Sequence, residues 1–387
     1  MPARRSTPSP LMRPPPDCRN FTGYKPCIPG TRCYRKCVAP SPRGRRILIV
    51  NLDAMGNVLV TTSILPPLKR KHPRSTVSWI TLPGAAPLLE QNPHLDRVFE
   101  WGPESWMILR SMRFDEVLCA DKSQRSGAFV MSLQARRKLG FGMDENGVIV
   151  PLNREAQENY ILGLDDHLKF RVNRKPVSRL LCEQFRLRYA RDPYVLRFSR
   201  DEEAFMARYG KEAGLKPEHT VVGLNTGCSD LYPNKKLTVD QHVELAGLLA
   251  RIPGVRVLLL GGPEDARRNA EIARRAGSRV LSTPCTEGVR RGLCYIALAD
   301  CVVTGDSFGM HAAIALGKHV LAWFGVSCPA EIDLFGRGEK FVPEGLECSP
   351  CWKRVCPTRV ECRSMVDVRA VAEAVRRFDA RRRAARG

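Results

Sequence analysis

The sequence lacks any apolar run long enough to cross a membrane. A spanning helix needs about 20 consecutive apolar residues, whereas Ile47–Val50 and Val320–Val326 are short and bounded by polar residues or glycine. The first residues contain arginines among many prolines but no apolar core of a secretory signal. We therefore expect a cytoplasmic protein and interpret the short apolar runs as buried strands.

Acidic residues are scarce at both ends of the chain. Residues 1–46 carry a charge of +10 and residues 365–387 carry +4, out of a net charge of +22. Basic ends predict attraction to an anionic surface such as phospholipid, or to nucleic acid, and a solvated face without a partner explains them equally well. Aromatic residues are also few there, with Phe21, Tyr24 and Tyr34 as the candidates, so nucleic acid is the less favoured partner.

A Gly-x-Gly-x-x-Gly motif is absent after every predicted strand, which argues against a dinucleotide-dependent oxidoreductase. Short β-rich runs instead alternate with segments of helical length, a pattern typical of a parallel sheet covered on both faces. In the first half, strands are predicted at Ile47–Asn51, Thr76–Thr81, Arg97–Trp101 and Glu116–Ala120, and helices at Asn57–Lys71, Ala85–Glu90 and Arg125–Arg136.

A second alternation follows a polar stretch and a helical segment near Val177–Ala190. Its strands are predicted at Val221–Asn225, Val255–Leu260, Cys301–Gly305 and His319–Phe324, and its helices at Val239–Leu249, Glu264–Ala276 and Met310–Leu316. Two doubly wound units predict an α/β protein of GT-B type, with two Rossmann-like domains facing a central cleft, and two-domain dehydrogenases share this pattern. We divide the chain into an extension (1–44), a first Rossmann-like domain (45–175), linker helices (176–215), a second Rossmann-like domain (216–365) and a basic C-terminal helix (366–387).

Three turns after predicted strands carry candidate binding residues, because ligands of parallel sheets bind beyond the carboxyl ends of the strands. Each turn also has a structural explanation: Asn57, Asp306 or Ser307 as helix caps, His311 in the core, and Lys235 on a solvated surface. The turns are Leu52–Val58, with Asp53, Gly56 and Asn57; Gly305–His311, with Asp306, Ser307, Gly309 and Met310; and Asn225–Ser229, with Thr226, followed by Lys235.

These turns, together with the Gly261–Glu264 segment and the cysteines from Cys348 to Cys362, resemble glycosyltransferase family 9, the lipopolysaccharide heptosyltransferases. The resemblance runs from about Arg45 to about Val371 in family order. It implies a GT-B fold, an ADP-heptose donor, a lipopolysaccharide inner-core acceptor at the inner-membrane surface, and inverting transfer without a required cofactor. It also implies that the first domain lies on the acceptor side and the second binds the nucleotide sugar, and that the C-terminal helix can pack back on the first domain.

The resemblance implies that Lys235 contacts the donor phosphates, that Glu264 contacts the ribose and that Asp306 contacts the heptose. It also implies that the loop over the pyrophosphate contains Ser307, Gly309 and Met310. Inverting transfer needs a general base, which the family places directly after the glycine of the first turn. That position is Asn57 here, and Asp53 is the acid in the same turn that can replace it. Phe308 is a second departure, since the family usually has glycine there.

The chain has 15 cysteines, and eight of them form two clusters. Four thiolates suit a structural zinc or an iron–sulfur cluster. In the extension, a metal is as well supported as free thiols, whereas in the C-terminal cluster packing thiols are slightly favoured. The clusters are Cys18, Cys27, Cys33 and Cys37, and Cys348, Cys351, Cys356 and Cys362.

The sequence thus favours a glycosyltransferase that moves a heptose or related sugar from an ADP-sugar to a glycolipid. A catalytically weak sugar-nucleotide binder is an alternative because of Asn57. A basic nucleic-acid or surface-binding protein with zinc modules is the other alternative, from a different class.

Overall fold

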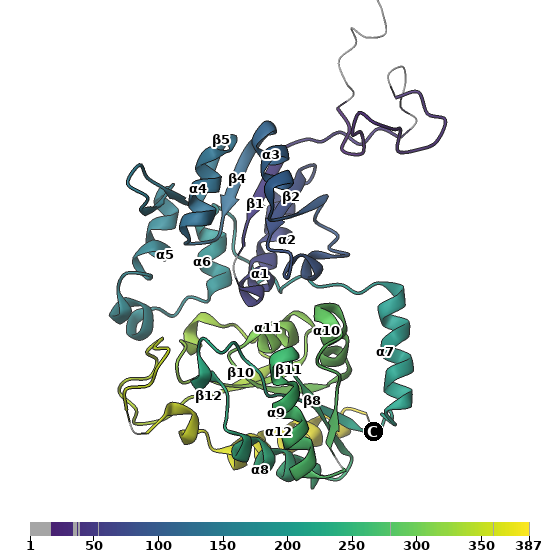
Figure 1. Cartoon of the computed structure of the whole chain (residues 1–387), viewed down its shortest axis with the longest axis vertical. Helices are drawn as coiled ribbons and strands as arrows, with labels where there is room; N and C mark the ends of the chain where they lie inside the picture. The colour runs from purple at the N-terminus through teal and green to yellow at the C-terminus, as the bar shows by residue number, and fades with distance from the viewer. Residues whose placement is uncertain are drawn as a thin grey trace, which may run out of the picture.

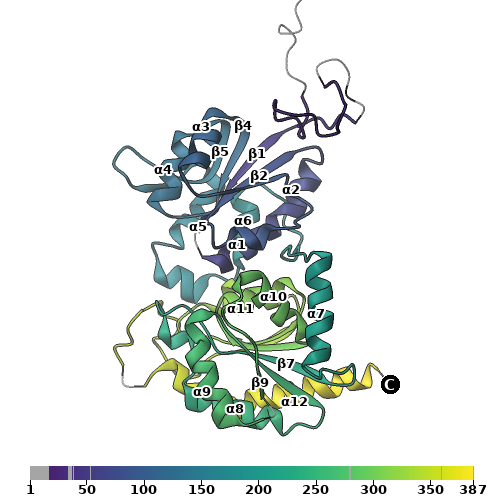
Figure 2. The same cartoon turned by 45° about the vertical axis from the view of Figure 1, so that its right-hand side comes forward.

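Two sheets organise the chain, one in each half, and helices cover both faces of each (Figures 1 and 2). The computed structural model describes residues 17–33, 37, 39–52, 54–278, 280–358 and 360–386. Asp53, a candidate base, lies outside the described residues. The architecture is the GT-B arrangement that the alternating pattern predicted.

The first sheet has the strand order β3-β2-β1-β4-β5-β6, and its strands are parallel apart from β6, which runs antiparallel to β5. Its central strand is apolar because helices bury it on both faces. The strands are β1 (Arg46–Val50), β2 (Thr76–Thr81), β3 (Arg97–Glu100), β4 (Arg113–Cys119), β5 (Gln134–Met143) and β6 (Ile149–Pro151). The helices are α1 (Met55–Thr61), η2 (Thr62–Ile64), α2 (Leu65–Lys71), η3 (Ala86–Leu89), α3 (Pro103–Ser111), α4 (Gln124–Ser132), η4 (Arg154–Ala156), α5 (Gln157–Ile161) and the π-helix η5 (Leu168–Val172).

The second sheet has the strand order β12-β11-β10-β7-β8-β9, and its strands are all parallel. The strands are β7 (Thr220–Asn225), β8 (Val255–Leu260), β9 (Val280–Ser282), β10 (Cys301–Gly305), β11 (His319–Trp323) and β12 (Gly338–Phe341). The helices are η6 (Pro233–Lys235), α8 (Val239–Ala250), η7 (Pro263–Asp265), α9 (Ala266–Ala276), α10 (Gly288–Leu298), α11 (Phe308–Ala315), η8 (Pro329–Glu331) and η9 (Cys362–Met365).

Two helices connect the sheets. α6 (Val177–Gln184) packs on the first domain through Leu181, and α7 (Arg200–Glu212) packs against α10 of the second (Figure 2). Between them, the Val195 amide donates to Thr62 Oγ1 at 2.8 Å. Helices α1 and α11 also pack together, so the first turn of the first domain meets the second domain directly.

The C-terminal helix α12 (Val368–Ala384) packs on the second domain, so the expected packing on the first domain is wrong (Figure 1). Val368, Val371 and Val375 are buried in the core of the second sheet, beside α8, which confirms the apolar stripe. The arginines at its end are tied to the same domain, since Arg382 forms an ion pair with Asp300.

The predicted helix Arg125–Arg136 is also wrong at its end, because α4 stops at Ser132 and Arg136 lies in β5. The first half of β5 is mostly exposed, so its sequence lacks the apolar run of a buried strand. Its pairing with β4, rather than local composition, determines its conformation.

Candidate active site

A buried ion pair lies at the carboxyl edge of the second sheet. Lys235 Nζ contacts Asp306 Oδ2 at 2.7 Å, and the two side chains are 10% and 11% exposed. η6 supplies the lysine and the turn after β10 supplies the aspartate. The sequence predicted both residues as donor ligands, and the fold brings them into contact.

Aromatic rings and charges surround this pair. Lys235 Nζ lies 4.3 Å from the centroid of the Trp352 ring and 5.3 Å from that of Tyr232. Burial raises the pKa of the Asp306 carboxyl, but the charge of Lys235 outweighs burial and holds the pKa below its usual value. Asp306 is therefore an ionised acceptor of hydrogen bonds at neutral pH.

Asn225 organises the loops next to the pair. Its Nδ2 donates to Ser307 Oγ and Thr304 Oγ1, each at 3.0 Å. Ser307 stands at the N-cap of α11 but makes no capping bond with its side chain, so the capping explanation does not hold. Gly309 is required for this packing, because a Cβ there would lie 2.7 Å from Asn225 Cγ. The amide thus fixes the start of α11.

Gly305 allows Lys235 to approach the end of β10. A Cβ at Gly305 would lie 2.2 Å from the Lys235 carbonyl oxygen, which accepts a hydrogen bond from Trp323 Nε1 at 2.9 Å. We expect Gly305→Ala to displace Lys235, lower the free energy of unfolding by about 1–3 kcal/mol, and weaken binding of an anionic ligand. Denaturant unfolding and ligand titration would measure both, with Gly247→Ala as the control, since a Cβ there meets nothing within 4 Å. Unchanged ligand binding by Gly305→Ala would contradict this role.

The turn after β1 faces this ion pair from the first domain. A Cβ at Gly56 would lie 2.6 Å from Cδ2 of His311, and His311 Nε2 is 3.9 Å from Asp306 Oδ1. His311 is buried, and burial lowers its pKa. Asn57 is the third residue of α1 and is exposed, so it is not the helix cap. Gly56 and Asn57 therefore border the predicted donor residues.

Three further candidates lie around this centre with different exposure. Thr226 is buried and bonded to Asn269, and the Met310 side chain is buried in the core. Glu264 is exposed on η7. Its neighbour Asp265 is buried and accepts a hydrogen bond from the Gly262 amide at 2.9 Å.

Comparison with known proteins identifies the family. The family described as glycosyltransferase family 9 (heptosyltransferase) matches residues 105–360, which is more than half of the chain. The chain belongs to glycosyltransferase family 9.

Relatives and solved structures agree with this family. The chain is 22% identical over 311 residues to lipooligosaccharide heptosyltransferase 2 of Haemophilus influenzae, covering 73% of this chain and 84% of the relative. It resembles the structure of a family 9 glycosyltransferase from Veillonella parvula, with a TM-score of 0.65 and 15% identity. The match covers 87% of this chain and 97% of that one. It also resembles the structure of ADP-heptose lps heptosyltransferase II of E. coli, with a TM-score of 0.64 and 18% identity. That match covers 87% of this chain and 99% of the other. The structural likeness establishes the fold.

Sequence reasoning missed a buried acid in the first domain of this glycosyltransferase. Asp121, after β4, accepts a hydrogen bond from Asn51 Nδ2 at 2.5 Å and another from the Leu52 amide. It thereby holds the chain that leads into the first turn. An acid two residues past a buried strand was the available signal, but its partners lie about seventy residues away in the chain.

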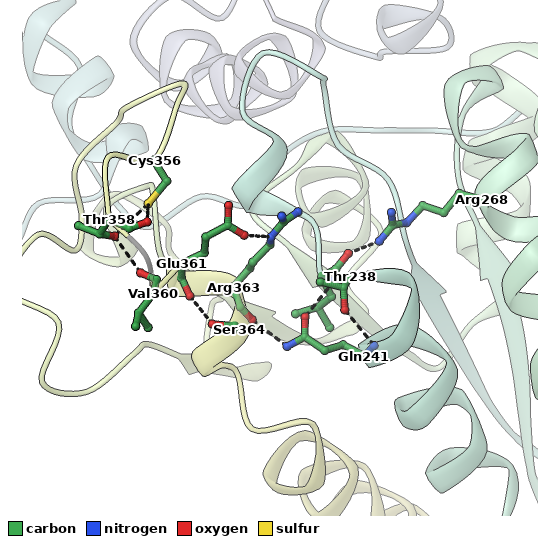
Figure 3. A network of polar contacts seen from close by, with 10 residues as sticks. Thr238, Gln241, Arg268, Cys356, Thr358, Val360, Glu361, Arg363 and Ser364 are labelled. Atoms are coloured by element: carbon green, nitrogen blue, oxygen red, sulfur yellow. Dashed lines mark hydrogen bonds and ion pairs between the residues drawn. The ribbon is translucent and has the colours of Figure 1, made fainter.

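The cysteines of the C-terminal cluster gather around one small cavity of this glycosyltransferase, at the end of the loop before η9. Gln241 of α8 donates to the Arg363 carbonyl in η9, directly after this loop, at 2.8 Å (Figure 3). Within the described ranges, no group of three or more His, Cys, Asp or Glu is placed to hold a metal ion. The cysteines of the cluster in the extension, Cys18, Cys27, Cys33 and Cys37, lie within these described ranges.

Among the described residues, no helix is both long and apolar enough to cross a membrane.

Proposed function

We propose that this glycosyltransferase moves a heptose or a related sugar from an ADP-sugar to the lipopolysaccharide inner core or a similar glycolipid, with inversion at the anomeric carbon. The observation that carries the proposal is the buried Lys235–Asp306 pair at the carboxyl edge of the second sheet. A relative named ADP-heptose lps heptosyltransferase II supports the choice of donor.

Different residues of the second domain bind different parts of the donor. Lys235 offers a point charge to the phosphates, and the ionised Asp306 accepts hydrogen bonds from sugar hydroxyls. The start of α11, with Ser307 and Gly309, presents backbone amides to the pyrophosphate. Glu264 is exposed and free to reach the ribose hydroxyls.

Asp53 is the proposed general base. The acceptor hydroxyl gives its proton to the Asp53 carboxylate while its oxygen bonds to the anomeric carbon. The bond from that carbon to the phosphate oxygen breaks, and ADP leaves with its charge offset by Lys235. Asn57 occupies the position that the family resemblance assigns to the base, and an amide does not accept this proton.

Calorimetric titration of the full chain with ADP-heptose tests the donor. We expect ADP-heptose to bind and UDP- and GDP-sugars not to bind under the same conditions. If none of these sugar nucleotides binds, the proposal is wrong. If all of them bind equally well, the proposed specificity for ADP is wrong.

A catalytically weak sugar-nucleotide binder is the second candidate, and the exposed Asn57 at the start of α1 favours it. Such a protein would bind ADP-heptose in the titration but transfer no sugar to a heptose-deficient lipopolysaccharide. Measurement of ADP release separates the two functions.

Peripheral contact with the inner membrane and metal binding by the cysteines stay predictions. The proposed transfer requires no cofactor. Analysis of zinc and iron in protein purified without a histidine tag decides the metal question, and vesicle flotation with anionic and neutral phospholipids decides the membrane question.

A further inference from the structure

The ring of Trp352 lies against the lysine of the proposed donor site. Trp352 belongs to the loop between β12 and η9 that carries the C-terminal cysteines. Lys235 Nζ is 4.3 Å from the centroid of its ring, well inside the distance of about 6 Å over which a ring face attracts a cation. Lys169 Nζ, from η5, is 5.1 Å from the same centroid. One tryptophan therefore contacts a lysine from each half of the chain.

Three neighbours hold the Lys235 ammonium in place. Asp306 Oδ2 is 2.7 Å away, and the rings of Trp352 and Tyr232 are the other two neighbours. These rings pack edge to face, with their centroids 5.2 Å apart and an angle of 83° between their planes. Edge-to-face packing is a favourable arrangement, so each ring supports the position of the other. The lysine is thus ordered by the protein itself.

The indole of Trp352 is not held by a hydrogen bond of its own. Its Nε1 is buried and has no acceptor among the residues that the structure describes. Ring contacts and the backbone therefore determine where the indole lies. Of the aromatic side chains, tryptophan attracts a cation most strongly, which suits its place beside Lys235.

The backbone of Trp352 is fixed in an uncommon conformation. Its φ is 50°, in the left-handed region that bulky side chains rarely adopt. The amides of Cys351 and Trp352 both donate to the Val326 carbonyl, at 3.1 and 2.9 Å. Ser349 Oγ donates to the Gly325 carbonyl at 2.7 Å. The loop after β11 therefore holds this conformation, in which the indole lies against the buried ion pair.

The cavity of the C-terminal cysteines joins the same two segments. It is lined by the four cysteines and also by Asn234, the neighbour of Lys235 in η6. The helices η6 and η9 are in contact as well. The segment that carries Trp352 and the segment that carries Lys235 are thus packed together beyond the contact between their side chains.

We propose that Trp352 is a positioning residue, whose ring holds the Lys235 ammonium in the orientation in which this lysine meets the donor phosphates. The inference rests on the proposed function, because that function assigns the phosphates to Lys235. A lysine that the protein has already ordered loses less side-chain freedom when it binds an anion, so the donor binds more tightly. Trp352 acts through Lys235 and takes no part in bond breaking.

Calorimetric titration of the full chain with ADP-heptose measures the effect on donor binding. Trp352→Leu and Trp352→Met both remove the aromatic ring but keep an apolar side chain. We expect each to bind the donor about tenfold more weakly than the wild type, as for the loss of one partly buried cation–π contact. Trp352→Phe keeps a ring and should retain most of the affinity. Thermal unfolding shows which variants are folded, and either ringless variant suffices for the test.

The mobility of the Lys235 side chain is the second measurement, and it needs no donor. In protein labelled with ¹³C-lysine, relaxation of the ε-methylene group reports motion of the side chain, and Lys235→Met assigns its signal. We expect Trp352→Leu to make this group more mobile on the nanosecond timescale and Trp352→Phe to leave it ordered. A structural role of Trp352 elsewhere in the loop would not change this mobility.

Trp106→Leu is the matched control. Trp106 is a half-buried tryptophan of the first domain, and its Nε1 likewise has no acceptor within the described part of the chain. Its ring packs on that of Trp101, with the centroids 4.9 Å apart. We expect this variant to match the wild type in donor affinity and in the mobility of Lys235.

Wild-type donor affinity in a folded variant without the ring would overturn the proposal, and so would unchanged mobility of Lys235. Equal weakening by Trp352→Phe and Trp352→Leu would indicate a purely structural role of the indole, which also overturns it. If the wild type binds no sugar nucleotide, the proposed function is wrong, and the mobility of Lys235 alone decides whether Trp352 positions this lysine.

Discussion

Asp53→Asn is expected to lower kcat at least about 100-fold, the usual minimum contribution of a general base, while the Kd for ADP-heptose stays unchanged. The physical reason is that an amide cannot take the proton of the acceptor hydroxyl. ADP release under saturating substrates measures kcat, and calorimetry measures donor binding.

Asn57→Asp provides the matched rescue for this prediction. It restores a carboxylate at the position that the family uses, and Asn57 is exposed, so the change is tolerated by the fold. We expect the double variant Asp53→Asn/Asn57→Asp to regain most of the lost turnover. Full activity of the single variant Asp53→Asn would remove Asp53 as the base.

Asp306→Ala is expected to abolish measurable ADP-heptose binding. The change removes the acceptor for sugar hydroxyls and leaves the buried Lys235 without its partner at 2.7 Å. Calorimetric titration measures the loss. Thermal unfolding is recorded alongside, because an uncompensated buried charge also destabilises the fold.

Two further variants separate binding from folding. Asp306→Asn keeps the shape of the side chain and should bind weakly while remaining folded. Asp230→Ala removes the exposed partner of Lys236 in the same segment, at 2.6 Å, and should bind like the wild type. Tight donor binding by a folded Asp306→Ala would contradict the assignment.

Two of the strands that the sequence predicted to the residue, Val255–Leu260 and Cys301–Gly305, are buried almost throughout. Their many apolar residues define them locally. β5 begins with exposed arginines and was missed, since its pairing with β4 determines its conformation.

The residues of the candidate site could likewise be predicted only in part. Lys235 and Asp306 could be predicted because each follows a recognisable strand or turn, but their contact across 71 residues could not. Asp121 and Asp265 have no local signature, since what distinguishes them is their burial and their hydrogen bonds in the folded chain.

The two ends of the described chain are attached to different domains. Arg19 pairs with Asp96 of the first domain at 2.8 Å, whereas α12 is packed into the second (Figure 1). A fluorophore at each end therefore reports on the angle between the domains without touching the site. Energy transfer between the two fluorophores would follow any rotation of the domains as donor and acceptor bind.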